Sequence, residues 1–288
     1  MDKANEIAVV KSSYSPYGGL EMRTVELVKR ILATGVKISL LTLPKQKWPI
    51  SHPNLRIIPL GSLIKNRLWQ LWRFERAVCN YLYAHSFKAV FSLDRVSCFT
   101  HFSAGEGSHK TFLHVKNSTS GTAARLFRKT SLFHAYTLYI EKKGFHNPQL
   151  KKIHCCSKMV AKNIENDYLV DSEKLQVIYN GINWKEIGNA FNNRAVIGEE
   201  LLKSHGLDSS NKFLLFLGSG FARKGLDIAI NGLLFLPQSY HLIVVGKDSC
   251  RAYVRQSEKL GLEKRVHFLG PQPQVCINMQ GNGFAFQI

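Results

Sequence analysis

A glycine-rich turn followed by two cations lies in the second half of the chain. Gly218, Ser219 and Gly220 come directly after an apolar run typical of a strand, and Arg223 and Lys224 stand just before a helical pattern. Glycine keeps such a turn open, and an arginine can hold two phosphate oxygens while a lysine adds a compact charge. Cations at a helix N-terminus oppose its macrodipole. The pair therefore predicts a bound diphosphate, against the alternative of a basic helix start without a ligand.

A second glycine turn lies between the first predicted strand and the helix after it. Gly18 and Gly19 belong to residues 14–20, whose sequence is Tyr-Ser-Pro-Tyr-Gly-Gly-Leu. Paired glycines at this place let backbone N–H groups approach a phosphate or a sugar, although many such turns are plain connections. The segment lacks the Gly-x-Gly-x-x-Gly spacing of a dinucleotide site, so a nicotinamide cofactor is not favoured.

A carboxylate and a histidine stand close together in residues 101–110. Glu106 lies between two glycines and His109 follows three positions later. The segment comes at the carboxyl end of a predicted strand, where parallel sheets gather their ligands. The two residues could form an acid/base pair or bind a sugar hydroxyl. Taken singly, either could equally be a surface hydrogen-bonding group.

The elements that must position these residues alternate between short β-rich runs and helical patterns, as in parallel α/β domains. We expect strands at residues 7–10, 37–43, 55–60, 89–93, 153–157, 175–178, 213–217, 241–245 and 266–269, and helices at 21–33, 68–83, 159–166, 226–234 and 252–260. The alternation restarts near residue 170. This predicts one domain at 1–170, a second at 171–270 that holds about half of a doubly wound nucleotide-binding domain, and an aberrant tail at 271–288 without clear periodicity.

The positive charge of the chain is concentrated in its first half. The net charge is +19, and residues 1–170 hold 26 of the 39 Lys and Arg but only 10 of the 20 Asp and Glu. This asymmetry predicts an anionic partner of that half, such as nucleic acid, a membrane surface or a phosphorylated acceptor, or a basic face that only aids solubility. The sequence contains no recognition helix, zinc finger or RNA-binding motif that would favour nucleic acid.

The N-terminus and the six cysteines predict a cytoplasmic protein. The N-terminus lacks the basic region, apolar core and cleavage site of a secretory signal, and no apolar run is long enough to span a bilayer. The cysteines form no CxxC pair and no zinc-type cluster with histidine. We therefore expect free thiols and no metal site, with the adjacent Cys155 and Cys156 buried as small core residues.

The three turns, in this order, resemble the retaining GT-B glycosyltransferases of family 4, and most closely the lipopolysaccharide core glucosyltransferases. Matching stretches are residues 14–20, 104–110, 174–183, 217–227 and 266–270, and the resemblance covers residues 6–273. It implies an α/β GT-B fold with two Rossmann-like domains that face a cleft. It also implies transfer of a hexose, with glucose expected, from a UDP-sugar to an inner-core heptose of lipopolysaccharide, without metal or further cofactor.

The resemblance also implies roles for single residues. Those expected to bind the donor are Gly18, Gly19, Gly218, Ser219, Arg223 and Lys224. Glu106 would orient or deprotonate the acceptor hydroxyl, and His109 would support it. Asn183 stands where the family usually has Asp.

The chain departs from the family at its end. The family's Glu-x7-Glu motif, the strands that complete the second sheet and the terminal helix that crosses back to the first domain have no counterpart in these 288 residues. The sequence therefore predicts an incomplete second domain with an unpaired sheet edge. An inactive, truncated remnant of such an enzyme is the second hypothesis, and a basic nucleic-acid-binding protein is the third.

Two stretches predict a peripheral position on the anionic inner membrane. Residues 63–77 and 124–143 mix large apolar and aromatic residues with Lys and Arg at near-helical spacing, which suits an anionic bilayer interface. The alternative for residues 63–77 is a helix that uses its Trp and Leu for the core. An enzyme with a lipid-anchored acceptor has to reach the membrane, so the resemblance favours the peripheral position.

Overall fold

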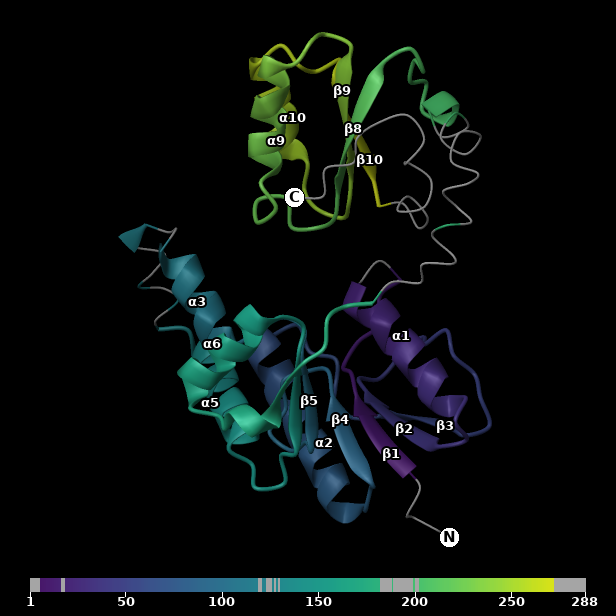
Figure 1. Ribbon diagram of the computed structural model, residues 1–288, viewed down its shortest axis with the longest axis vertical. Helices are drawn as coiled ribbons and strands as arrows, with labels where there is room; N and C mark the ends of the chain where they lie inside the picture. Colours follow the sequence, from purple (N-terminus) through teal and green to yellow (C-terminus); the bar gives the residue numbers. More distant parts are fainter. Residues whose placement is uncertain are drawn as a thin grey trace. The chain divides into compact units, whose positions relative to one another are not determined.

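The computed structural model in Figure 1 describes residues 6–16, 19–118, 121–122, 126, 128, 130–181, 188, 199 and 202–271. The chain divides into two compact units, Met1–Asn180 and Gly181–Ile288. The sequence predicts a domain boundary at residue 170. In the structure, β7 (Leu175–Val177) pairs in parallel with β6 (Lys152–Cys155), so residues 175–177 belong to the sheet of the first unit.

A parallel seven-stranded sheet forms the centre of the first unit. Its strand order is β3-β2-β1-β4-β5-β6-β7, and every pairing is parallel. The strands before β6 are β1 (Glu6–Val10), β2 (Lys37–Thr42), β3 (Leu55–Pro59), β4 (Ala89–Ser92) and β5 (His101–Ala104). The order reverses between β1 and β4, which is the place in an open α/β sheet where ligands bind beyond the strand ends.

Helices cover both faces of this sheet. They are α1 (Gly19–Leu32), α2 (Arg67–Ala84), α3 (His109–Ser118), α5 (Leu132–Phe145) and α6 (Lys158–Tyr168), with the short 3-10 turn η2 (Ser172–Lys174) before β7. Successive strand residues point to opposite faces: Val9 packs with the Val25 and Val28 side chains of α1, whereas Val10 packs with Phe74 of α2. Helix α1 therefore covers one face, and α2 covers the other.

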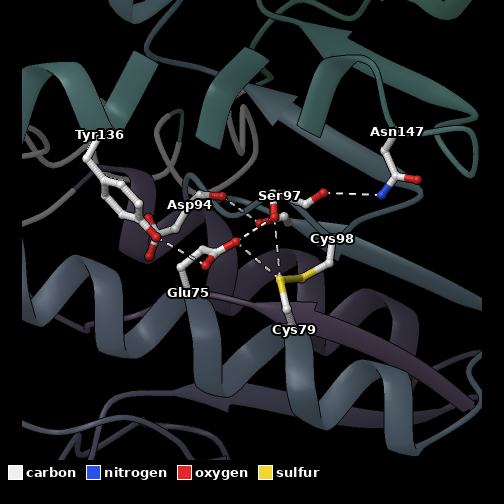
Figure 2. Close-up of a disulfide and its surroundings, with 8 residues drawn as sticks. Glu75, Cys79, Asp94, Ser97, Cys98, Tyr136 and Asn147 are labelled. Atoms are coloured by element: carbon white, nitrogen blue, oxygen red, sulfur yellow. Dashed lines mark hydrogen bonds between the residues drawn. A yellow bond between two sulfur atoms is a disulfide. The ribbon is translucent and has the colours of Figure 1, made fainter. Parts of the chain in front are cut away.

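A disulfide joins Cys79 of α2 to Cys98 in the loop between β4 and β5, with an S–S distance of 2.05 Å (Figure 2). Both half-cystines are buried. The expectation that all cysteines are free thiols is therefore wrong at these two positions. They come together because α2 packs across the sheet face beneath that loop, a contact that the sequence spacing does not reveal. Cys155 is buried and free, as expected, and Cys156 is free and half-buried.

The second unit contains a three-stranded parallel sheet in the order β10-β9-β8. Its elements are β8 (Lys212–Leu217), α9 (Leu226–Gly232), the 3-10 turn η3 (Leu233–Phe235), β9 (Tyr240–Val245), α10 (Arg251–Lys259) and β10 (Val266–Gly270). This is the predicted βαβαβ series. Leu242 and Val244 face the helices with Leu226, whereas Ile243 and Val245 pack against Leu202 on the other face.

Candidate functional site

The turn that opens α1 borders open space at the carboxyl end of the first sheet. Helix α1 begins at Gly19, and Gly18 lies outside the described residues. Among the described residues, a Cβ atom on Gly19 would meet no heavy atom within 4 Å outside its chain neighbours and the backbone of its own helix. The space beside Gly19 is therefore open in the part of the chain that the structure describes.

The Glu106 loop, which comprises residues 105–108 between β5 and α3, lies beside the start of α1. A Cβ atom on Gly105 would be 3.7 Å from Nη1 of Arg23 and 3.8 Å from Cδ1 of Leu20. The first unit thus brings together two segments that are about 85 residues apart in the sequence, because β1 and β5 end at the same edge of a parallel sheet. The glycine turn and the Glu106 loop can contribute to one site.

Glu106 and His109 have different surroundings within that loop. The Glu106 side chain is 67% exposed, and its Oε2 lies 3.1 Å from Nη1 of Arg95. His109 is buried, and its Nε2 lies 3.0 Å from Nδ1 of His134. Among the described residues, no hydrogen bond joins the two side chains to each other. Glu106 can meet a substrate, whereas His109 lies beneath the loop surface.

The protonation state of His109 follows from its position. Burial, together with the electrostatic effects of Arg95 and His134, lowers the pKa of His109 to about 4. The imidazole is therefore neutral at pH 7, and it cannot contribute a positive charge to a reaction.

A buried ion-pair cluster stands where the strand order reverses. Nζ of Lys11 lies 3.0 Å from Asp94 Oδ1 and 3.4 Å from Glu21 Oε1, and Asp94 also accepts the backbone N–H of Ser12 at 2.5 Å. Burial alone lowers the pKa of Lys11, but the two carboxylates outweigh it and raise that pKa above its ordinary value. The cluster links β1, α1 and the loop after β4, so it fixes the edge that carries both segments.

Sequence reasoning did not find Lys11, Asp94 or Arg95. A signal was available, since Lys11 directly follows predicted strand 7–10, and Asp94 and Arg95 directly follow predicted strand 89–93. Charged residues at the carboxyl ends of parallel strands are candidates for a site. The pairing of these residues, however, depends on which strands are neighbours.

The second unit brings together the predicted glycine turn and both cations. Gly218 and Gly220 have positive φ angles of 128° and 79°, a conformation that favours glycine. Nζ of Lys224 donates a hydrogen bond of 3.1 Å to the carbonyl oxygen of Leu217, and a Cβ on Gly220 would be 3.5 Å from Nε of Arg223. The two cationic side chains therefore fold back over the turn.

Hydrogen bonds from the end of β9 hold this turn in place. Oδ2 of Asp248 accepts the backbone N–H of Phe221 at 2.9 Å, and Oγ of Ser219 accepts that of Lys247 at 3.1 Å. Hydrogen bonding, first from Phe221, lowers the pKa of Asp248. The turn is thus a defined structure between two strand ends.

The position of the cations differs in one respect from the expectation. Helix α9 begins at Leu226, after Gly225 with φ +72°, so Arg223 and Lys224 lie in the turn before the helix and not in its first turn. The two cations therefore do not oppose the macrodipole from within the first turn of α9. The feature that remains is the cationic pair itself: Arg223 is exposed, Lys224 is half-buried, and the Lys224 side chain lies against Gly218.

Comparison with known proteins gives concordant matches. The sequence profile of Glycosyltransferase Family 4 matches residues 17–186. The chain is 24% identical over 281 residues to the lipopolysaccharide glucosyltransferase WaaG of Escherichia coli (strain K12), which covers 93% of the chain and 70% of the relative.

Two solved structures resemble the fold. The crystal structure of WaaG aligns with a TM-score of 0.81 at 21% identity, over 97% of this chain and 74% of that one. The structure of HepE from Anabaena in complex with UDP-glucose aligns with a TM-score of 0.61 at 16% identity, over 94% of this chain and 71% of that one. These matches confirm the fold class expected from the sequence.

Proposed function

Because the chain belongs to glycosyltransferase family 4, we propose that it transfers glucose from UDP-glucose to an inner-core heptose of lipopolysaccharide, with retention of anomeric configuration and without a metal. The chain has a GT-B fold and is a glycosyltransferase. The proposal concerns its sugar, its acceptor and its site residues. WaaG is a lipopolysaccharide glucosyltransferase and the HepE structure contains UDP-glucose, and both relatives support this choice.

The observation that carries the proposal is the placement of Arg223 and Lys224 over the turn from Gly218 to Gly220. In the donor, two phosphates join the sugar to uridine, and the UDP leaving group gains negative charge as the glycosidic bond breaks. Lys224 has three N–H donors, of which one bonds to Leu217 and the others can meet phosphate oxygens. Fixed positive charges that face developing negative charge stabilise a transition state without a metal.

On the acceptor side, we assign Glu106 to the sugar hydroxyl. Its exposed carboxylate at the carboxyl end of β5 can accept a hydrogen bond from the hydroxyl and orient it for attack. The neutral His109 supports the loop from below, and Gly18 and Gly19 would leave room for the donor sugar and diphosphate. The excess of 26 Lys and Arg over 10 Asp and Glu in residues 1–170 suits an anionic acceptor.

We also propose a peripheral position at the anionic inner membrane surface. Helix α2 buries Phe74 and Val78, but it leaves Trp69 53% exposed, and Leu63, six residues earlier in the chain, is 50% exposed. The guanidinium of Arg67 lies 4.6 Å from the ring centre of Phe133. Exposed apolar side chains beside cations support binding to an anionic bilayer.

Of the second stretch, Arg125, Phe127 and Lys129 lie outside the described residues. Among the described residues, no helix has the length and apolar character needed to cross a bilayer.

The membrane proposal can be tested by sedimentation with vesicles. The chain should bind vesicles that contain phosphatidylglycerol and not neutral phosphatidylcholine vesicles, and Trp69→Ser should weaken this binding. Equal binding to both vesicle types, or none to either, would contradict the proposal.

Turnover of UDP-glucose with an inner-core acceptor tests the function. Arg223→Ala and Lys224→Ala should each lower kcat by about 100-fold, the usual cost of removing one transition-state donor. Arg255→Ala, which removes an exposed cation from α10 of the same unit, is the matched control and should retain wild-type activity. Retention is checked by the anomeric configuration of the product, and independence from metal by activity in excess chelator. A folded wild-type chain without measurable UDP binding by calorimetry would overturn the proposal in favour of an inactive remnant.

A further inference from the structure

A buried carboxylate lies directly beneath the Glu106 loop. Glu141 is in the last turns of α5, and its side chain is 1% exposed. A buried carboxylate is costly unless it is paired and hydrogen-bonded. Its partners are Nε of Arg95 at 3.1 Å, the backbone N–H of His109 at 2.9 Å and 3.1 Å to its two oxygens, and the hydroxyl of Tyr168.

Arg95 connects this buried carboxylate to the exposed one. While Nε contacts Glu141, Nη1 lies 3.1 Å from Oε2 of Glu106 and Nη2 lies 3.3 Å from the carbonyl oxygen of Gly107. The guanidinium is planar and holds its donors in a fixed fork. The position of Glu141 therefore determines the direction from which Arg95 meets Glu106.

The loop has a second anchor that does not involve Arg95. The hydroxyl groups of Ser108 and Thr111 both donate to Oδ2 of Asp167 in α6, the latter at 2.6 Å. This anchor holds the start of α3. It leaves the Glu106 side chain, two residues earlier, to be oriented by Arg95.

We propose that Arg95 and Glu141 are positioning residues that hold the Glu106 carboxylate in the orientation that receives the acceptor hydroxyl; this rests on the function proposed above. An exposed glutamate has many rotamers, and only a few point its carboxylate at one place. The Arg95 fork selects one of them before the acceptor binds. Group transfer requires such placement, because a misplacement of about 1 Å can cost about 100-fold in rate.

The sharpest test is a double-mutant cycle of Arg95→Lys with Glu106→Gln. Lysine keeps the charge but cannot form the fork. Arg95→Lys should raise the acceptor KM and lower acceptor kcat/KM about 30-fold, within the range that misplacement produces, with the affinity for UDP unchanged. In the Glu106→Gln background the same change should cost less than about twofold, because residues that act as a unit are not additive.

Glu75→Gln is the matched control for Glu141→Gln. Glu75 is another buried carboxylate of the first unit. It accepts hydrogen bonds from Ser97 and Tyr136 (Figure 2) and, among the described residues, forms no hydrogen bond with the Glu106 loop. Glu141→Gln should raise the acceptor KM. Glu75→Gln should lower the stability of the protein but leave the acceptor KM unchanged. Amide hydrogen exchange gives a readout besides activity: exchange at Gly107 and His109 should speed up in Glu141→Gln and not in Glu75→Gln.

The outcomes separate this inference from the proposed function. Suppose that the wild type transfers the sugar. If the effects of Arg95→Lys and Glu106→Gln are then additive, or if Arg95→Lys leaves the acceptor KM unchanged, the positioning role is overturned and the proposed function stands. A wild-type chain that transfers no sugar overturns the proposed function, and the positioning role is lost with it.

Discussion

Gly246 at the end of β9 lies against the backbone of Gly218 at the end of β8. A Cβ atom on Gly246 would be 2.2 Å from the carbonyl oxygen of Gly218 and 2.7 Å from its carbonyl carbon. These are backbone atoms, so no side-chain rotation can relieve the contact. The close approach of two strand ends therefore requires glycine at position 246 and sets the shape of the turn that carries Arg223 and Lys224.

Gly246→Ala should displace this turn. We expect the second unit to lose about 1–3 kcal/mol of unfolding free energy, the usual cost of forcing an extra methyl group into a packed site, and UDP affinity to fall with it. Urea unfolding and calorimetry with UDP measure the two effects. Gly232→Ala is the control, because a Cβ at this helical glycine meets no described atom within 4 Å outside its own helix and chain neighbours, so it should stabilise by up to about 1 kcal/mol. Wild-type UDP affinity in Gly246→Ala would contradict the role given to this turn.

The disulfide predicts that reductant weakens the first unit. Cys79 and Cys98 close a loop with a sequence separation of 19, and a cross-link over a loop of that length stabilises by about 3 kcal/mol, chiefly by restricting the unfolded chain. The urea midpoint of the wild type should therefore fall when dithiothreitol is added. The Cys79→Ser/Cys98→Ser double variant should unfold at the same midpoint with and without reductant. A wild type that is insensitive to reductant would speak against the bond.

The strands could be predicted because their signal is local. The apolar run at residues 37–43 and β2 (Lys37–Thr42) nearly coincide, since a strand buried on both faces is a continuous apolar run. The bounds of β5 could not be predicted: its four residues, His101–Ala104, alternate polar and apolar side chains and pair with β4 through only two residues. Helix α5 was not predicted as a core helix. Its sequence contains Lys142 and Lys143, and a stretch of this composition is typical of a segment that binds a membrane surface.

The site could be predicted only in part, for a related reason. Residue type and position after a strand pointed to Glu106, Arg223 and Lys224. The contacts that orient Glu106 join Arg95 to residues 11 and 46 positions away, and such pairings follow from strand order and helix packing. Glu141 in particular has the residue type of a surface charge, and only the fold shows that it is buried.

Acid should destabilise the first unit through His109. Its folded-state pKa of about 4 lies below the ordinary value of about 6.5, so the unfolded chain takes up a proton first as the pH falls. The stability that the neutral ring provides is complete above pH 6.5 and is lost between pH 6.5 and pH 4, at no more than about 1.4 kcal/mol per pH unit. Burial also lowers the pKa values of His101 and His154, which adds to the slope.

Urea unfolding between pH 4 and pH 8 measures this dependence. His109→Gln keeps a donor and an acceptor but cannot take up a proton in this range, so its stability should fall less steeply below pH 6.5 than that of the wild type. Parallel curves for the two proteins would show that His109 is not held neutral by the fold.

Lys11 should contribute more to stability than any exposed ion pair of the first unit. Lys11→Met removes the cation that neutralises Asp94 and Glu21, whose side chains are only 21% and 18% exposed. Removing one partner of a buried pair costs about 3–5 kcal/mol, and we expect the lower end of this range because both carboxylates still reach water. Arg30→Ala breaks the Arg30–Glu26 pair, which is 73% and 57% exposed, and should cost less than about 0.5 kcal/mol. Urea unfolding of the two variants at pH 7 gives the comparison. Equal losses would mean that the cluster at the β1–β4 strand ends does not hold that edge of the sheet together.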